Sequence, residues 1–211
     1  RVGADFDAAV RSMRQRLEAP AVEIQFPDGA AETFAGIVDL VDRVYLTFDA
    51  ATKGREVASL PLPERLAAET EARRAKMIEA VAEVHDGLAE RFLRDEEIGA
   101  DAIRAAFREA TLSRRVVPVL CGAALRNAGI QPVLDAACAY LPSPVEIPAA
   151  QGTLPGSGAP VAREPRVSAP FAALVFKVVA ASSADLYYLR VYSGRLRAGE
   201  RVLNPRTGEK E

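Results

Sequence analysis

The sequence predicts an α/β fold followed by an all-β segment. Apolar side chains recur at helical spacing in several stretches between residues 6 and 141. The continuous apolar run Val116–Leu120 is typical of a strand buried on both faces. Three short stretches after residue 165 alternate as β-strands do. With 211 residues, 49% of them hydrophobic, the chain has enough apolar surface to build a core.

The first part of the chain is predicted to mix one helix with three strands. Apolar residues between Phe6 and Leu17 form a stripe along one helix, for which Asp5 is the N-cap. Val22–Phe26 alternates with period two, as a half-buried strand does. The runs at 34–40 and 44–48 are separated by three residues, so we expect them to form a hairpin.

Helices are predicted at 63–93 and 101–113. In the longer one, apolar residues recur every three or four positions, and Gly87 is expected to weaken or bend it. The buried strand Val116–Leu120 then leads through a short loop of small residues into a helix from Ile130 to about Leu141. In α/β folds, loops at the carboxyl ends of strands bind ligands.

The last third of the chain is predicted to hold a linker and the start of a β-domain. Residues 148–165 are rich in Pro, Gly, Ala and Ser, which indicates a linker or surface loop. Strands are expected at 171–179, 186–192 and 201–204. Because too few residues remain to close a barrel, and the chain opens without an initiator Met, we expect an internal fragment of a longer protein.

Composition excludes several classes of function. Two Cys and one His are too few for a disulfide framework or a zinc site. No apolar run approaches the roughly 18 residues of a membrane span, so we expect a soluble, cytoplasmic protein with no membrane partner. The formal charge of −2 argues against coating nucleic acid by bulk charge. Residues 64–97 carry 6 basic and 10 acidic groups, whereas 163–211 carry 9 and 5. This asymmetry is either ordinary surface variation or a sign of different partners.

No self-contained active site is evident. Phosphate-loop, dinucleotide-binding, zinc-protease and serine-hydrolase motifs are all missing. His85 is interpreted as a helical surface residue, and Cys121 and Cys138 as small hydrophobic residues. Asp39 and Asp42 suit hairpin and solvent roles better than an acid–base pair. The sequence therefore predicts no catalytic residue and no metal ligand.

Three separated signatures resemble translation elongation factor G. Residues 119–135 (VLCGAALRNAGIQPVLD), with YLPSP at 140–144, look like the segment that carries the fifth guanine-binding motif of that family. The opening RVGADF resembles the segment immediately after its Asn-Lys-x-Asp motif. PFAALVFK, RVYSG and GERVLN, between residues 170 and 204, are similar to its second domain. Together these signatures span almost the whole chain.

The resemblance implies a domain layout. Residues 1–19 and 115–147 would be the C-terminal part of a P-loop-type GTPase domain, and 20–114 its α+β G-prime insertion. After a linker at 148–165, residues 166–211 would begin a β-barrel domain II. The phosphate loop, both switches and the Asn-Lys-x-Asp motif are not in the chain. The parent would bind GTP and Mg²⁺ and drive ribosomal translocation, whereas this fragment alone is expected to be inactive.

The resemblance also implies a cofactor-binding loop at Ala123, Ala124 and Leu125, where the backbone N–H of Ala124 would contact the guanine carbonyl. Ala123 stands where the family has Ser, and Arg126 where it has Lys. The insertion would contact the flexible stalk protein of the large ribosomal subunit. The candidate partner-binding residues form an acidic helical face: Glu79, Glu83, Asp86 and Glu90.

The basic residues of 163–211 fit a contact with ribosomal RNA. Two other interpretations stay open. One is a paralogous ribosome-associated GTPase of the recycling, release or tetracycline-protection type. The other is a non-catalytic protein-interaction module. The length of the insertion, roughly 95 residues, favours elongation factor G proper among these.

Overall fold

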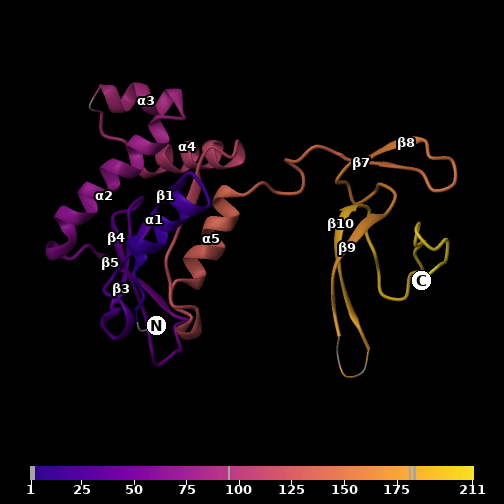
Figure 1. Ribbon diagram of the computed structural model, residues 1–211, viewed down its shortest axis with the longest axis horizontal. Helices are drawn as coiled ribbons and strands as arrows, with labels where there is room; N and C mark the ends of the chain where they lie inside the picture. The colour runs from indigo at the N-terminus through magenta and orange to yellow at the C-terminus, as the bar shows by residue number, and fades with distance from the viewer. Residues whose placement is uncertain (1–2, 95, 181, 183) are drawn as a thin grey trace. The chain divides into compact units, whose positions relative to one another are not determined.

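The computed structural model describes residues 3–94, 96–180, 182 and 184–211 (Figure 1). The chain divides into two compact units, Arg1–Leu141 and Pro142–Glu211. The first unit contains α1 (Phe6–Arg16), β1 (Ala21–Glu23), β2 (Gln25–Asp28), β3 (Gly36–Asp39), β4 (Val44–Phe48), β5 (Val57–Pro61), α2 (Glu64–Ala82), α3 (Asp86–Leu93), α4 (Ala100–Leu112), β6 (Val117–Val119) and α5 (Ile130–Tyr140), with 3-10 turns η1 (Ala31–Thr33) and η2 (Ala124–Arg126). The second contains β7 (Ala150–Thr153), β8 (Pro160–Arg163), β9 (Ala172–Val179) and β10 (Leu186–Ser193).

Helix α1 begins as predicted, because the Asp5 carboxylate accepts a hydrogen bond from the Ala8 backbone N–H at 2.8 Å. Its Val10 is buried against Ala21 of β1 and Val119 of β6. The predicted apolar stripe is shorter than expected, since Leu17 lies beyond the helix and is 73% exposed.

The single strand predicted at Val22–Phe26 is divided between two sheets. Strand β1 pairs in parallel with β6, whereas β2 pairs antiparallel with β3. Ile24, between them, donates its N–H to the Val119 carbonyl and accepts from the Leu40 N–H, both at 3.0 Å. One continuous stretch of chain thereby connects the two sheets.

The larger sheet has the order β2-β3-β4-β5 and is antiparallel throughout. The hairpin expected between 34–40 and 44–48 is confirmed as β3–β4. Strand β5 was not predicted. The Asp28 carboxylate connects this sheet to α2. It accepts hydrogen bonds from the Tyr45 hydroxyl of β4, at 2.6 Å, and from both terminal nitrogens of Arg65 on α2. This ion pair lowers the pKa of Asp28.

The prediction of one helix over 63–93 was wrong, because the structure has two helices, α2 and α3. The chain leaves helical geometry at His85, whose Nδ1 accepts from the Leu88 N–H at 3.1 Å and so caps α3. Gly87 lies within the first turn of α3, two residues after the break. A side-chain cap, rather than the glycine, therefore marks where the helix is interrupted.

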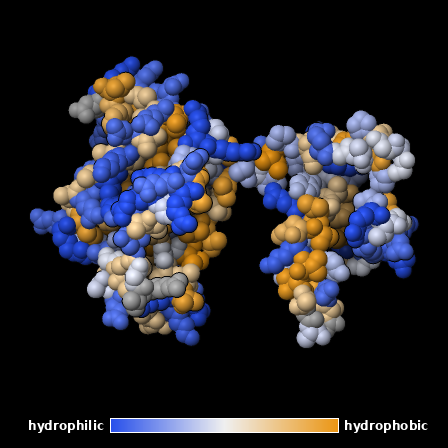
Figure 2. Space-filling view, in the orientation of Figure 1, coloured by the Kyte–Doolittle hydropathy of each residue, from blue (hydrophilic) through white to orange (hydrophobic). Residues whose placement is uncertain are grey.

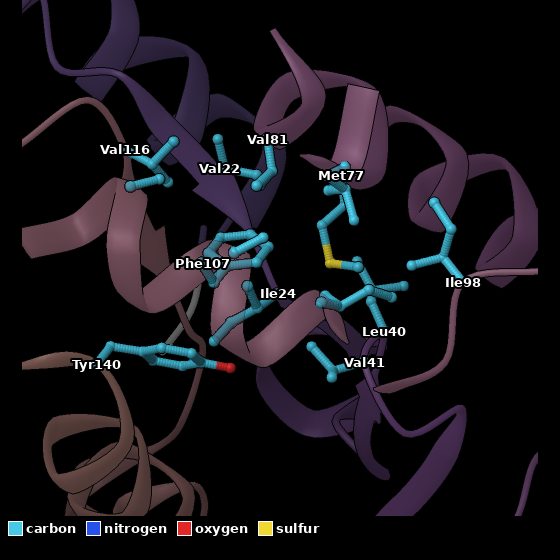
Figure 3. Packing of buried hydrophobic residues seen from close by; sticks show 14 of the residues in the cluster. Val22, Ile24, Leu40, Val41, Met77, Val81, Ile98, Phe107, Val116 and Tyr140 are labelled. Carbon is cyan, nitrogen blue, oxygen red and sulfur yellow. The ribbon is translucent and has the colours of Figure 1, made fainter. Parts of the chain in front are cut away.

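The main core lies between the sheet and helices α2 and α4. In Figure 3, Phe107 of α4 and Met77 of α2 converge with Ile24, just before β2, and Leu40, just after β3. The Phe107 ring also meets that of Tyr140 on α5, with centroids 5.9 Å apart. Helix α5 thereby joins the same core, and its predicted span is confirmed.

Strand β6 was predicted to be buried on both faces, and this was wrong for the described residues. Val119 is 5% exposed, but Val117 is 44% exposed. Within the part of the chain that the structure describes, β1 is the only strand paired with β6. The apolar run therefore predicted the position of the strand correctly, but the strand is less buried than such a run indicates.

Among its described residues, the second unit contains two β-hairpins, β7–β8 and β9–β10. The stretch predicted to be a linker, 148–165, contains the antiparallel pair β7–β8, which corrects that prediction. The strands expected at 171–179 and 186–192 are confirmed as β9 and β10, which pair antiparallel. Among the described residues, the third predicted strand is reduced to one bridge between Leu203 and Lys210. Figure 2 shows hydrophobic side chains gathered over the β9–β10 hairpin.

Candidate functional site: the loop before helix α5

The candidate site is the loop from residue 120 to 129, between β6 and α5. A backbone hydrogen bond from the Ala123 N–H to the Ala128 carbonyl, at 2.8 Å, joins the two sides of the loop at its base. We call this closed base, residues 121–123 and 128–129, the neck of the loop. Inside the neck, η2 turns the chain, and the N–H groups of Arg126 and Asn127 donate to the carbonyls of Ala123 and Ala124. Asn127 has φ 54°, a left-handed conformation that Asn tolerates well.

The neck has no room for side chains at two positions. A Cβ on Gly129 would lie 2.5 Å from the Cys121 carbonyl oxygen, and one on Gly122 would lie 2.7 Å from the Ala128 carbonyl oxygen. Gly129 also has φ +82°, which L-residues rarely adopt. These two glycines let the ends of the loop approach closely enough to hold its tip in one shape.

The three predicted cofactor-binding residues differ in whether their backbone N–H groups are available to a ligand. The Ala123 N–H is used in closing the neck. Ala124 and Leu125 are the first residues of η2, so their backbone N–H groups point out of the N-terminal end of the turn. Both residues are exposed, and the Leu125 side chain is fully in solvent. The tip therefore presents backbone donors suited to a carbonyl or an anion.

A turn that precedes β5 supports this loop, and the sequence did not reveal it. The Asn127 side-chain amide donates to the Lys53 carbonyl at 2.8 Å. The Gln131 amide donates to the carbonyls of Gly54 and Arg55 at 2.8 and 3.2 Å. A Cβ on Gly54 would lie 2.4 Å from the Arg126 carbonyl oxygen. The partners are more than 70 residues apart, so no local pattern signals the contact.

Replacing Gly129 with alanine is expected to lower the free energy of unfolding of the first unit by about 2–3 kcal/mol, because the new Cβ meets backbone in a left-handed conformation. Urea denaturation followed by circular dichroism measures this. Gly87→Ala is the control, since its Cβ would meet only the His85 ring, at 3.4 Å, and alanine favours helix. Equal stability of the two variants would refute the role given to Gly129.

The two cysteines are expected to react at different rates. Burial raises the pKa of the Cys121 thiol to about 12, whereas Cys138 is exposed. Because thiolate is the reactive form, iodoacetamide at pH 8 should alkylate Cys138 at least about tenfold faster. Peptide mass spectrometry over time measures both rates, and faster labelling of Cys121 would contradict the assignment.

The same shift makes stability depend on pH. The folded state holds the Cys121 proton more tightly than the unfolded chain, whose thiol pKa is near the ordinary value of 9.0. The protonated Cys121 thiol therefore contributes to the free energy of unfolding. This contribution is fully present below pH 9 and is lost as the pH rises towards about 12.

The four predicted partner-binding residues are all exposed, but they do not lie on one helix. Glu79 is near the end of α2 and Glu83 caps that end, whereas Asp86 and Glu90 are on α3. Glu90 also lies 3.8 Å from Arg94 in an ion pair. The acidic surface is therefore divided between two helices that meet at His85.

The other candidates have structural roles. The Asp39 carboxylate accepts hydrogen bonds from the backbone N–H groups of Val41 and Asp42 within the hairpin, and Asp42 pairs with Arg104.

In the described part of the chain, no group of three or more His, Cys, Asp or Glu side chains is arranged to hold a metal ion. Within the same residues, no helix is long and apolar enough to cross a membrane.

Known proteins resemble this chain along its whole length. Elongation factor G 2 from Syntrophus aciditrophicus (strain SB) is 42% identical over 211 residues, which are 100% of this chain and 31% of that protein. Elongation factor G 2 from Geobacter metallireducens is 44% identical over 208 residues, 99% of this chain and 30% of that protein. The chain is elongation-factor-G-like throughout.

A solved structure shares the fold of most of the chain. A crystal structure from Thermus thermophilus, of the protein designated ttk003000868, matches 94% of this chain and 27% of its own, with a TM-score of 0.65 and 28% identity. No protein-family model matches the chain. The chain spans about 30% of the length of its elongation factor G relatives. The predicted resemblance and the mixed α/β fold are confirmed.

Proposed function

We propose that this chain is part of an elongation-factor-G-like GTPase that acts in the cytoplasm and promotes ribosomal translocation during protein synthesis. The observation that carries the proposal is 42–44% identity to elongation factor G over the whole chain. In the parent protein, GTP and Mg²⁺ would be held by the phosphate loop and switches, which this sequence does not contain. This chain would therefore supply nucleotide contacts rather than catalytic groups.

The contact with the nucleotide is proposed to come from the tip of the loop before α5. The exposed backbone N–H of Ala124 is the donor to the guanine carbonyl, flanked by Ala123 and Leu125. Ala123 lacks the hydroxyl that the family uses to brace this loop. The closed neck and the Asn127 amide bonded to Lys53 support the loop in its place. A backbone donor needs only a fixed loop, whichever groups fix it.

The domain layout is proposed to follow the family. Residues 1–19 and 115–147 belong to the GTPase domain, 20–114 to the G-prime insertion, and 166–211 to the start of domain II. The parallel pairing of β1 with β6 supports a slightly later start of the insertion, at about residue 24. The basic residues of the last part, 9 against 5 acidic groups in 163–211, support a contact between domain II and ribosomal RNA.

A chimera tests the nucleotide role. The segment of Syntrophus aciditrophicus elongation factor G 2 that matches this chain is replaced by this chain, and binding of a fluorescent guanine nucleotide is titrated. We expect an affinity within about tenfold of the unmodified factor, a change of about 1.4 kcal/mol. A folded chimera that does not bind the nucleotide would contradict the proposal. The chain alone should show no binding at micromolar nucleotide, since one backbone contact is too little.

The acidic surface is proposed to meet the stalk protein of the large ribosomal subunit. Changing Glu79, Glu83, Asp86 and Glu90 to lysine should slow association of the chain with that protein by about tenfold at low salt. It should also reduce the salt dependence of the association rate, because electrostatic steering acts on the rate at which the two proteins meet. Stopped-flow fluorescence measures both quantities.

The control for this experiment carries the same change in net charge elsewhere on the first unit. Four other exposed glutamates are changed to lysine for this purpose: Glu18, Glu32, Glu56 and Glu64. If both variants slow association equally, net charge rather than the α2–α3 surface governs the encounter. If neither does, the acidic surface is not the docking site.

A further inference from the structure

The turn before β5, residues 49–56, is held in one shape by its own hydrogen bonds. The Asp49 N–H donates to the Glu56 carbonyl at 3.1 Å, next to the paired strands β4 and β5. Within the turn, the Gly54 N–H donates to the Asp49 carbonyl at 2.8 Å, and the Thr52 hydroxyl accepts from the Glu56 N–H at 3.1 Å. The turn is therefore anchored in the four-stranded sheet.

This turn is joined to the candidate loop by side-chain and backbone contacts. The Asn127 amide nitrogen donates to the Lys53 carbonyl at 2.8 Å, and the Gln131 amide nitrogen donates to the next two carbonyls of the turn, at 2.8 and 3.2 Å. Because a carbonyl can only accept, each contact needs an amide N–H. The backbones are also close, since a Cβ on Gly54 would lie 2.4 Å from the Arg126 carbonyl oxygen. The turn and the loop therefore hold each other in place.

These contacts fix one side of the loop tip, and the neck fixes the other. The Asn127 N–H donates to the Ala124 carbonyl at 3.0 Å, so Asn127 is bonded both to the tip and to the turn. On the other side, Ala123 is bonded to Ala128. The direction of the exposed Ala124 N–H depends on both. A hydrogen bond weakens steeply when its donor turns away, and a donor fixed beforehand costs less entropy on binding.

We propose that Asn127 and Gln131 are positioning residues for the guanine contact, and that the turn before β5 acts through them on how long the base stays bound. This inference rests on the proposed contact between the Ala124 N–H and the guanine carbonyl. It goes beyond that contact because the turn belongs to the proposed insertion, 20–114, whereas the loop belongs to the GTPase domain. The insertion thereby governs nucleotide release in addition to its proposed contact with the stalk protein.

Isosteric variants of the chimera with Syntrophus aciditrophicus elongation factor G 2 test the proposal. Gln131→Glu and Asn127→Asp keep the side-chain shape but place a carboxylate against carbonyls, and Asp tolerates the left-handed conformation. Each should speed release of fluorescent GDP about tenfold in stopped-flow measurements. Gln15→Glu, the same chemical change at an exposed position of α1, should alter the rate by less than about twofold.

The analogue 6-thio-GDP separates positioning from a general loss of affinity. It replaces only the base carbonyl oxygen, by sulfur, which is a weak acceptor. The unmodified chimera should prefer GDP by about tenfold, and Gln131→Glu and Asn127→Asp should reduce this preference to about two- to threefold. If the variants weaken both nucleotides equally, the positioning role is wrong and the guanine contact stands. If the unmodified chimera prefers neither nucleotide, the Ala124 contact is itself wrong, and the inference falls with it.

Discussion

Replacing Arg74 with methionine is expected to lower the free energy of unfolding of the first unit by about 3–5 kcal/mol. Arg74 is on α2 and is 4% exposed. Its guanidinium donates to the carbonyls of Leu40, Val41 at 2.8 Å, and Ile98 at 3.0 Å. Methionine fills similar space but donates nothing, so three buried carbonyls lose their partner. Arg74 thereby joins the end of β3 and the segment before α4 to α2.

Urea denaturation monitored by circular dichroism measures the loss. Lys76→Met is the matched control, because Lys76 is exposed on the same helix and its replacement should change the unfolding free energy by no more than about 0.5 kcal/mol. Arg74→Lys should recover only part of the loss, since an ammonium cannot reproduce the planar fork. Comparable stability of Arg74→Met and Lys76→Met would show that the three carbonyls do not depend on Arg74.

The second large effect is expected at Phe107. Its side chain is fully buried on α4, at the place where the core of the sheet and α2 meets Tyr140 of α5. Replacing it with alanine removes a ring from a packed core and should cost about 3–5 kcal/mol. Leu112→Ala, on the same helix and 42% exposed, should cost much less. Thermal and urea unfolding of both variants measure the difference, and a loss below that of Leu112→Ala would exclude Phe107 from the core.

Much of the fold could be predicted because it is encoded locally. Helix α1 begins at an Asp cap, the β3–β4 hairpin follows from alternation around a short turn, and α5 follows from its apolar spacing. These features depend on residues close in the chain. The resemblance to elongation factor G also came from contiguous runs of residues, and the comparisons confirm it.

The errors occurred where a capping side chain or a distant strand partner interrupts a pattern that is continuous in the sequence. The apolar spacing continues across residues 83–85, so only the His85 cap and its Leu88 partner reveal the break between α2 and α3. Likewise, alternation continues from β1 into β2, although they pair with strands nearly 80 residues apart. Pairing partners, not propensity, decide where such a strand is divided.

The candidate site was predicted only in part for the same reason. Its tip, Ala123–Leu125, came from a contiguous motif. Its support by the Lys53–Arg55 turn, through Asn127 and Gln131, depends on contacts across more than 70 residues. The four acidic residues are exposed as expected, but the break at His85 distributes them over two helices.

We expect this chain to be able to serve as the corresponding segment of an elongation factor G. Ribosome-dependent GTP hydrolysis by the chimera with Syntrophus aciditrophicus elongation factor G 2 tests it most directly. We expect turnover that is stimulated by ribosomes to within about tenfold of the unmodified factor, and a clear loss of nucleotide affinity when Gly129→Ala is added. A folded chimera that binds GTP but is not stimulated by ribosomes would contradict the claim.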